Sequence, residues 1–135
     1  MKMKKFINDA NTVTDELLVG LGLAHSDILD VDGHLVISKD LKDADRVTIV
    51  TCGGSGHEPA QPGFVGKGML DVQAVGDIFA APSGQLVFEA MKLPKKCQDI
   101  LSTYWSYLGV DMEHLAFIHY AAMVHKYVSR GAYIP

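Results

Sequence analysis

The sequence of 135 residues has little cysteine and no excess of positive charge. Its two cysteines, Cys52 and Cys97, lie far apart and have no CxxC spacing, so a disulfide framework is not expected. Reduced, structural thiols are typical of a cytoplasmic protein. The net charge of −4 gives no basic surface for a phosphate backbone, so we expect no nucleic acid among the partners.

Long apolar runs are also missing. A membrane-spanning helix needs about 20 consecutive apolar residues, and no stretch of this sequence approaches that length. Acidic and amide side chains fill positions 8–16, where a secretory signal would have its apolar core. We therefore expect a cytoplasmic protein without a membrane partner.

Composition changes near Pro94. Residues 1–91 hold eleven of the 13 glycines and have a net charge of −6, whereas residues 92–135 hold seven of the eleven aromatic residues and have a net charge of +2. This change predicts two segments, an α/β segment over 1–91 and a helical tail over 92–135.

The apolar periodicity predicts an α/β fold. Helical spacing is found in four segments: 11–24, a helix beginning at Pro82, 96–108 and 112–130. Strands are predicted where short, mostly β-branched segments occur: 35–37, 46–51 and 71–75. A turn is predicted at 30–33. Together these elements predict a small, mostly parallel sheet with flanking helices, followed by a helical C-terminal tail.

The strand predicted at 46–51 runs directly into a glycine cluster, which reads GGSGHEP over 53–59. Open α/β sheets bind ligands at the carboxyl ends of their strands. Glycines allow positive φ, and successive amide N–H groups form a concave surface that suits an oxygen-rich ligand. The pattern lacks the lysine of a nucleotide P-loop and the third glycine of a dinucleotide fingerprint. The alternative is a tight turn without a ligand.

His57 stands at the end of this cluster. Histidine is the side chain that most readily exchanges a proton near neutral pH, so His57 is a candidate for proton transfer or ligand contact. The alternative is a hydrogen-bonded loop histidine with a structural role.

Three ordered motifs resemble the N-terminal part of the dihydroxyacetone kinase substrate-binding subunit, across about residues 3–91. They read KKFIND at 4–9, GGSGHEP at 53–59 with GFVGKGML at 63–70, and GDIFAAPS at 76–83. The resemblance is specific because the order and the spacing of the motifs agree, as well as their wording.

The resemblance implies that the chain binds dihydroxyacetone, whose terminal hydroxyl a nucleotide-carrying partner phosphorylates. It implies that Gly54, Ser55, Gly56 and His57 contact the substrate, and that His57 is the general base. It further implies no cofactor in this chain: ATP or ADP with Mg is held by a partner subunit or domain. A phosphocarrier subunit is the other implied partner, in the version that uses phosphoenolpyruvate. A small parallel sheet also exposes an edge that needs cover. The aromatic-rich tail is one candidate for this cover and dimerisation is another, so we also expect a homodimer.

The sequence departs from the family in two places. Cys52 stands where the glycine motif usually has another glycine, and residues 91–99 read MKLPKKCQD where the family has a Lys-Asn-Tyr-x-Gly-Asp segment. The lysine and aspartate of that segment complete the family's substrate site, and a later histidine binds the ketone carbon covalently. Two alternatives therefore stay open: a non-catalytic triose-binding or regulatory homologue, and a truncated inactive fragment.

The tail contains His114, His119 and His125. Glu113 and His114 do not form an HExxH motif, so no metal site is predicted. The segment 114–119 weakly resembles the end of a phosphotransferase regulation domain, which would make His119 or His114 a phosphate acceptor. The alternative is a pair of helices whose histidines are structural.

Overall fold

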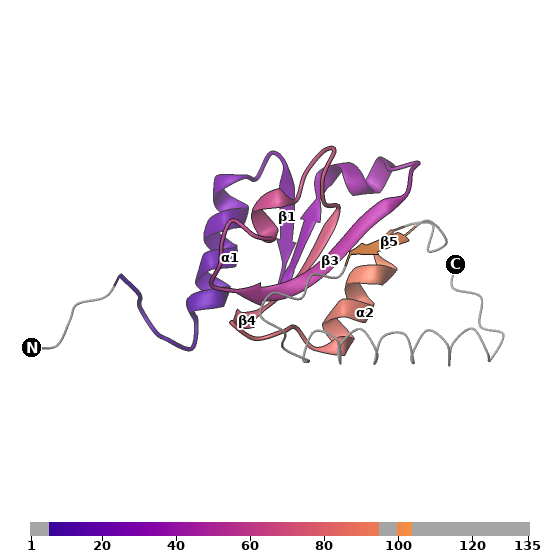
Figure 1. Ribbon diagram of the computed structural model, residues 1–135. Helices are drawn as coiled ribbons and strands as arrows, with labels where there is room; N and C mark the ends of the chain where they lie inside the picture. Colours follow the sequence, from indigo (N-terminus) through magenta and orange to yellow (C-terminus); the bar gives the residue numbers. More distant parts are fainter. Residues whose placement is uncertain (1–5, 95–99, 104–135) are drawn as a thin grey trace, which may run out of the picture.

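The computed structural model describes residues 6–94 and 100–103, which form one five-stranded sheet with helices on its faces (Figure 1). In chain order the elements are α1 (Val13–Ala24), β1 (Leu29–Asp32), β2 (Leu35–Ser38), the 3₁₀-helix η1 (Lys39–Asp43), β3 (Thr48–Ser55), the 3₁₀-helix η2 (Pro62–Phe64), β4 (Val72–Ile78), α2 (Gly84–Lys92) and β5 (Ile100–Thr103). The α/β class is therefore confirmed. Within the described ranges, neither α-helix is long and apolar enough to cross a bilayer.

The sheet is mixed, where the sequence predicted a mostly parallel one: among the described strands, β2 runs against the other four. Its strand order is β1-β2-β4-β3-β5, with β1–β2 and β2–β4 antiparallel and β3–β4 and β3–β5 parallel. The reason lies between β1 and β2, where two residues, Gly33 and His34, connect the strands. So short a connection can join only antiparallel strands, and Gly33 adopts the positive φ of 56° that a tight hairpin turn favours.

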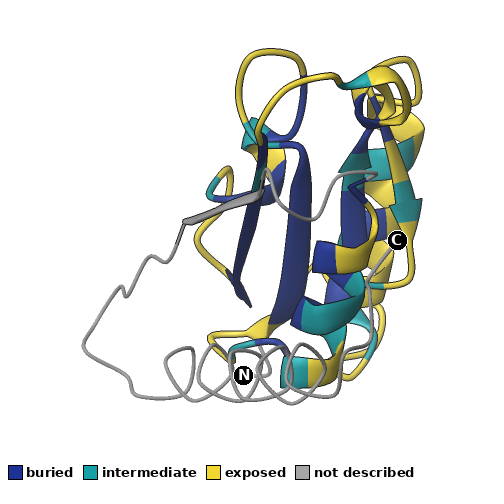
Figure 2. Cartoon of the chain, turned by 90° about the vertical axis from the view of Figure 1, so that its right-hand side faces the viewer, coloured by how far each residue is buried: buried dark blue, intermediate teal, exposed yellow. Residues whose placement is uncertain are grey.

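Each face of the sheet packs against one helix. Alternate residues of a strand point to opposite faces, and neighbours on β2 accordingly belong to different clusters. Leu35 belongs to the cluster on the α2 side, whereas Val36 belongs to the cluster beneath α1. Figure 2 shows the two long strands buried along much of their length. The core is thus two thin apolar layers, separated by the sheet.

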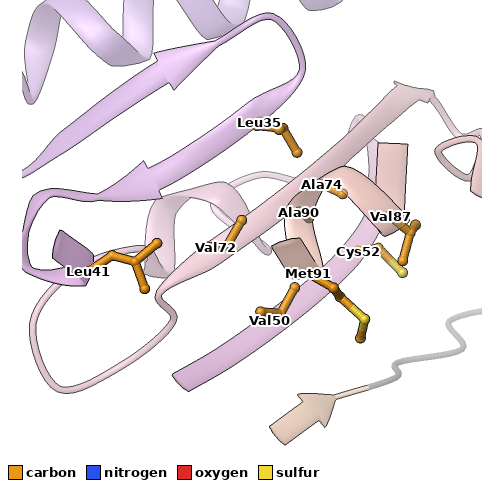
Figure 3. Packing of buried hydrophobic residues seen from close by; sticks show 9 residues of the cluster. All are labelled: Leu35, Leu41, Val50, Cys52, Val72, Ala74, Val87, Ala90 and Met91. Atoms are coloured by element: carbon orange, nitrogen blue, oxygen red, sulfur yellow. The ribbon is translucent and has the colours of Figure 1, made fainter. Parts of the chain in front are cut away.

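The layer under α2 contains residues from the strands β2, β3 and β4, from η1 and from α2 itself (Figure 3). Its buried members are Leu35, Leu41, Val50, Cys52, Val72, Ala74, Val87, Ala90 and Met91. Cys52 is a buried thiol within this layer, as the sequence predicts for a structural cysteine. Where the family motif usually has glycine, this chain therefore has a side chain that packs in the core.

The stretch 96–108 was predicted as a helix, and its described residues contradict this. Ile100–Thr103 forms β5, which pairs in parallel with Thr48–Thr51 of β3. The partner strand provides the hydrogen bonds that override the local helical pattern. The second tail helix, predicted over 112–130, lies outside the described residues. The division of the chain at 91/92 stays a prediction.

Candidate functional site

The strand β3 is longer than predicted and includes the first part of the glycine cluster. It runs to Ser55, and Gly53 pairs with Val75 of β4 before a register shift brings Ser55 opposite Ile78. Gly53 and Gly54 are buried as strand residues. The cluster therefore becomes a loop only at Gly56, where φ is +105°.

The start of β3 is fixed to β4 by a buried carboxylate. Asp71 is fully buried and accepts hydrogen bonds from Arg46 Nη1 and Nη2, at 2.8 and 2.7 Å. The same carboxylate accepts the Ile49 N–H at 2.8 Å. Paired charge-assisted bonds of this kind are stronger than neutral ones, so they fix the amino ends of both strands on which the candidate site is built.

Gly54 and Gly76 allow the chain after β4 to pass close to the strand ends. A Cβ on Gly54 would lie 2.7 Å from the Ala80 carbonyl oxygen, and a Cβ on Gly76 would lie 2.1 Å from the same atom. Both distances are far below van der Waals contact, so any side chain would displace backbone. Close packing within the protein thus explains both glycines; contact of Gly54 with a ligand stays a prediction.

Ser55 connects the ends of β3 and β4. Its side chain is buried, and its Oγ–H donates to the Gly76 carbonyl oxygen at 2.7 Å. Its own carbonyl oxygen accepts the Phe79 N–H at 2.8 Å. The hydroxyl therefore has a structural partner in this arrangement. Contact of the Ser55 hydroxyl with a substrate stays a prediction.

Gly56 and His57 are exposed at the carboxyl end of β3, beside the end of the parallel strand β4. The Gly56 N–H donates to both carboxylate oxygens of Glu58, at 3.0 and 3.2 Å. Backbone amides that already hold a carboxylate can also hold the oxygen of a ligand. His57 follows on the same turn, where a solvent molecule or a small ligand can reach it.

Two apolar side chains next to this turn were not predicted as site residues. A Cβ on Gly56 would lie 3.2 Å from Ile78 Cγ2 and 3.3 Å from Phe79 Cζ. Both side chains are largely exposed, and Phe79 has a positive φ of 53°. They belong to the GDIFAAPS motif at 76–83, one of the three motifs that carry the resemblance. The four predicted site residues are thus contiguous, with Gly54 and Ser55 buried and with Gly56 and His57 exposed.

A separate groove lies between α1 and β1 and has a volume of about 440 Å³. Leu18, Leu23 and Val31 are among the residues that line it. None of the predicted site residues contributes to it. The tail histidines 114, 119 and 125, considered above as metal ligands or phosphate acceptors, lie outside the described residues.

Comparison with known proteins agrees with the resemblance seen in the motifs. Residues 19–126 match the model of the Dak1 domain family, a range that continues beyond residue 91. The dihydroxyacetone-binding subunit DhaK of the PTS-dependent dihydroxyacetone kinase 1 of Listeria innocua is 36% identical over 108 residues, which are 79% of this chain and 33% of that protein. The DhaK subunit of the PEP-dependent kinase of Escherichia coli is 38% identical over 108 residues, which are 79% of this chain and 30% of that protein.

A solved structure shows the same fold. The native form of the dihydroxyacetone kinase of C. freundii superposes with a TM-score of 0.78 at 29% identity, covering 91% of this chain and 23% of that one. The chain spans about a third of the length of the Listeria and Escherichia relatives. It belongs to the Dak1 domain family and is homologous to part of the dihydroxyacetone-binding subunit DhaK.

Proposed function

We propose that the turn at the carboxyl end of β3 is part of a dihydroxyacetone-binding site, and that His57 is its general base. The observation that carries the proposal is the position of Gly56 and His57, exposed together where two parallel strands end. Ligands of open α/β sheets bind at this edge. The DhaK relatives are named for binding the same triose.

The turn offers groups that match a small keto-triose. The Gly56 N–H is a donor for a carbonyl or hydroxyl oxygen, which would replace the Glu58 carboxylate at that amide. The Ile78 and Phe79 side chains, close to the Gly56 Cα, offer an apolar wall for the carbon face of the ligand. Such a site binds through few atoms, so we expect a dissociation constant in the range of about 1–10 mM.

His57 would act on the terminal hydroxyl. The imidazole takes the hydroxyl proton, the hydroxyl oxygen forms a bond to the terminal phosphorus of a nucleotide held by a partner subunit, and the bond between that phosphorus and the nucleoside diphosphate breaks. A positioned base contributes about 10²–10⁴-fold to such a step. The remaining acceleration comes from positioning and charge stabilisation by the partner.

The phosphate source follows from the same proposal. The relatives named PTS-dependent and PEP-dependent favour a nucleotide-binding partner subunit that a phosphocarrier subunit recharges. A cytoplasmic location, a homodimer and a role in glycerol metabolism are further parts of the proposal. The Lys-Asn-Tyr-x-Gly-Asp segment does not occur in these 135 residues, so we expect binding without turnover by this chain alone.

Titration of dihydroxyacetone against the full chain, followed by NMR, tests the binding step. We expect saturation in the wild type, and affinity at least about fivefold weaker in His57→Ala, because one polar contact is lost. The matched control is His25→Ala, which removes another exposed histidine, at the end of α1. Absence of saturable binding to the wild type up to about 50 mM, well above the affinity expected for so small a ligand, would refute the proposal.

Reconstitution tests the chemical step. ATP with Mg and a nucleotide-binding partner subunit are added to the chain, and dihydroxyacetone phosphate is measured. Binding without product supports the non-catalytic alternative. Product that depends on His57 supports a catalytic role for its imidazole.

A further inference from the structure

We propose that His34 is a positioning residue for the candidate site, which clamps helix α1 to the middle of β4 and thereby holds Ser55 in place. The consequence for ligand affinity rests on the proposed function. The clamp itself does not, and it can be tested without a ligand.

Both ring nitrogens of His34 have an acceptor. Nδ1 lies 3.0 Å from the Val75 carbonyl oxygen, and Nε2 lies 2.9 Å from Asp15 Oδ1. A carbonyl and a carboxylate oxygen can only accept, so both nitrogens must donate at the same time. Only the protonated imidazolium has two N–H donors. The geometry is therefore that of a cation held between α1 and β4.

The main chain reinforces the attachment to β4. The Val75 N–H donates to the His34 carbonyl oxygen at 2.8 Å, so His34 binds both polar backbone groups of Val75. The carbonyl oxygen of the next residue, Gly76, accepts a hydrogen bond from the Ser55 hydroxyl at 2.7 Å. The path from the His34 ring to the end of β3 thus passes through two consecutive residues of β4.

Two carboxylates influence the ring, Asp15 from α1 and Asp77 from β4. Desolvation is the largest single influence and lowers the pKa of His34. The hydrogen bonds to Asp15 and Val75, with the charges of Asp15 and Asp77, together outweigh it and raise that pKa above its ordinary value of 6.5. The ring has a side-chain exposure of 28%, so its protons exchange with solvent while it keeps its partners.

Loss of the proton removes one of the two bonds. A neutral ring that keeps the proton on Nδ1 loses its hydrogen bond to Asp15 of α1. A neutral ring that keeps the proton on Nε2 leaves the Val75 carbonyl without this donor. In both cases the positive charge next to Val75 disappears. We then expect a change at Gly76 of β4 and in its hydrogen bond with Ser55. The clamp is closed below the pKa of His34 and opens as the pH rises through it.

Amide NMR spectra of the full chain between about pH 5.5 and 9, a range that brackets the histidine pKa, test the clamp directly. The spectra are recorded in a His57→Gln variant, so that the imidazole of the loop does not contribute to the shifts of these amides. We expect the Gly76 and Ser55 amides to shift with the same midpoint as the His34 ring. That midpoint should disappear from both amides in His34→Gln and move to lower pH in Asp15→Asn.

The control is His25→Gln, which should leave the shared midpoint unchanged, since His25 is an exposed histidine at the C-cap of α1. Asp15→Asn keeps the shape of its side chain and therefore serves if His34→Gln does not fold. Gly76 and Ser55 amides that show no component at the midpoint of the His34 ring would overturn the proposal.

A second arm measures dihydroxyacetone affinity against pH in the wild type and in Asp15→Asn, with His57 intact in both. We expect affinity to fall about fivefold as His34 loses its proton, at the low end of typical coupling between sites, and the fall to occur at lower pH in Asp15→Asn. Identical pH profiles would remove the link between clamp and site. No binding at any pH would refute the proposed function, while the amide shifts would still decide on the clamp.

Discussion

Replacement of Gly76 by alanine probes the packing that orders the candidate site. The new Cβ would lie 2.1 Å from the Ala80 carbonyl oxygen, 2.7 Å from the Pro82 nitrogen and 2.8 Å from the Ala81 carbonyl carbon. Ordinary van der Waals contact begins at 3.4 Å, so the segment after β4 has to retreat by more than an ångström. These are all backbone atoms, which no rotamer change can move away.

The expected loss of stability is large. Overpacking a well-packed region costs about 1–3 kcal/mol. Retreat of the segment also disturbs the Ser55 bond to the Gly76 carbonyl, a contact worth about 1 kcal/mol. We therefore expect Gly76→Ala to lower the free energy of unfolding by about 3 kcal/mol. Gly54→Ala should cost less, because its closest distance to Ala80 is longer, at 2.7 Å.

The matched control is Gly20→Ala in α1. A Cβ at Gly20 has nothing within 4 Å, and the position is exposed in the middle of the helix. Alanine there should raise the free energy of unfolding by about 0.5–1 kcal/mol. Urea unfolding followed by circular dichroism gives both values. A Gly76→Ala variant as stable as the wild type would refute the packing described here.

Three further changes have defined outcomes. Arg46→Ala should lower the free energy of unfolding by about 2–3 kcal/mol in urea unfolding, because it leaves the buried Asp71 without its bidentate partner. The guanidinium is partly exposed, so the loss is smaller than for a fully buried pair. A variant with the stability of the wild type would contradict this expectation. Ser83→Ala should cost about 1 kcal/mol by the same assay, since its hydroxyl accepts the Leu86 N–H at the start of α2, and Ser83→Asp should retain most of that stability. The raised pKa of His34 adds stability that is complete below pH 6.5 and is lost as the pH rises through the folded-state pKa. His34→Gln should therefore remove this pH dependence from thermal unfolding curves. An unchanged pH dependence would count against the ion pair of His34 and Asp15.

Local sequence patterns were sufficient for the elements whose reasons are local. The β-branched run that ends at Thr51 predicted β3, and Ser83 after Pro82 predicted the beginning of α2. They failed at β1, where Asp30 and Asp32 suggested a turn. Those side chains are on the exposed side of an edge strand that exists because it pairs with β2. β5 was missed for the same reason, since its pairing with β3 is not visible in its own residues.

The predicted site residues lie at and just after the carboxyl end of β3, and their surroundings depend on contacts with distant parts of the chain. The resemblance implied that Gly54 and Ser55 contact the substrate. In the fold, Gly54 packs close to Ala80, and the Ser55 hydroxyl donates to the Gly76 carbonyl oxygen; both partners belong to β4 or to the segment that follows it. Only a folded sheet brings these groups together. The exposed pair, Gly56 and His57, agrees with the expectation of an accessible loop.

Chemical-shift mapping with dihydroxyacetone tests the central claim most directly, because it shows where on the chain the triose binds. If the turn after β3 is the site, saturable shifts will centre on the amides of Gly56, His57 and Phe79, and those of Leu23 and Val31 in the α1–β1 groove will stay fixed. Saturable shifts confined to that groove, or none up to about 50 mM triose, would contradict the account.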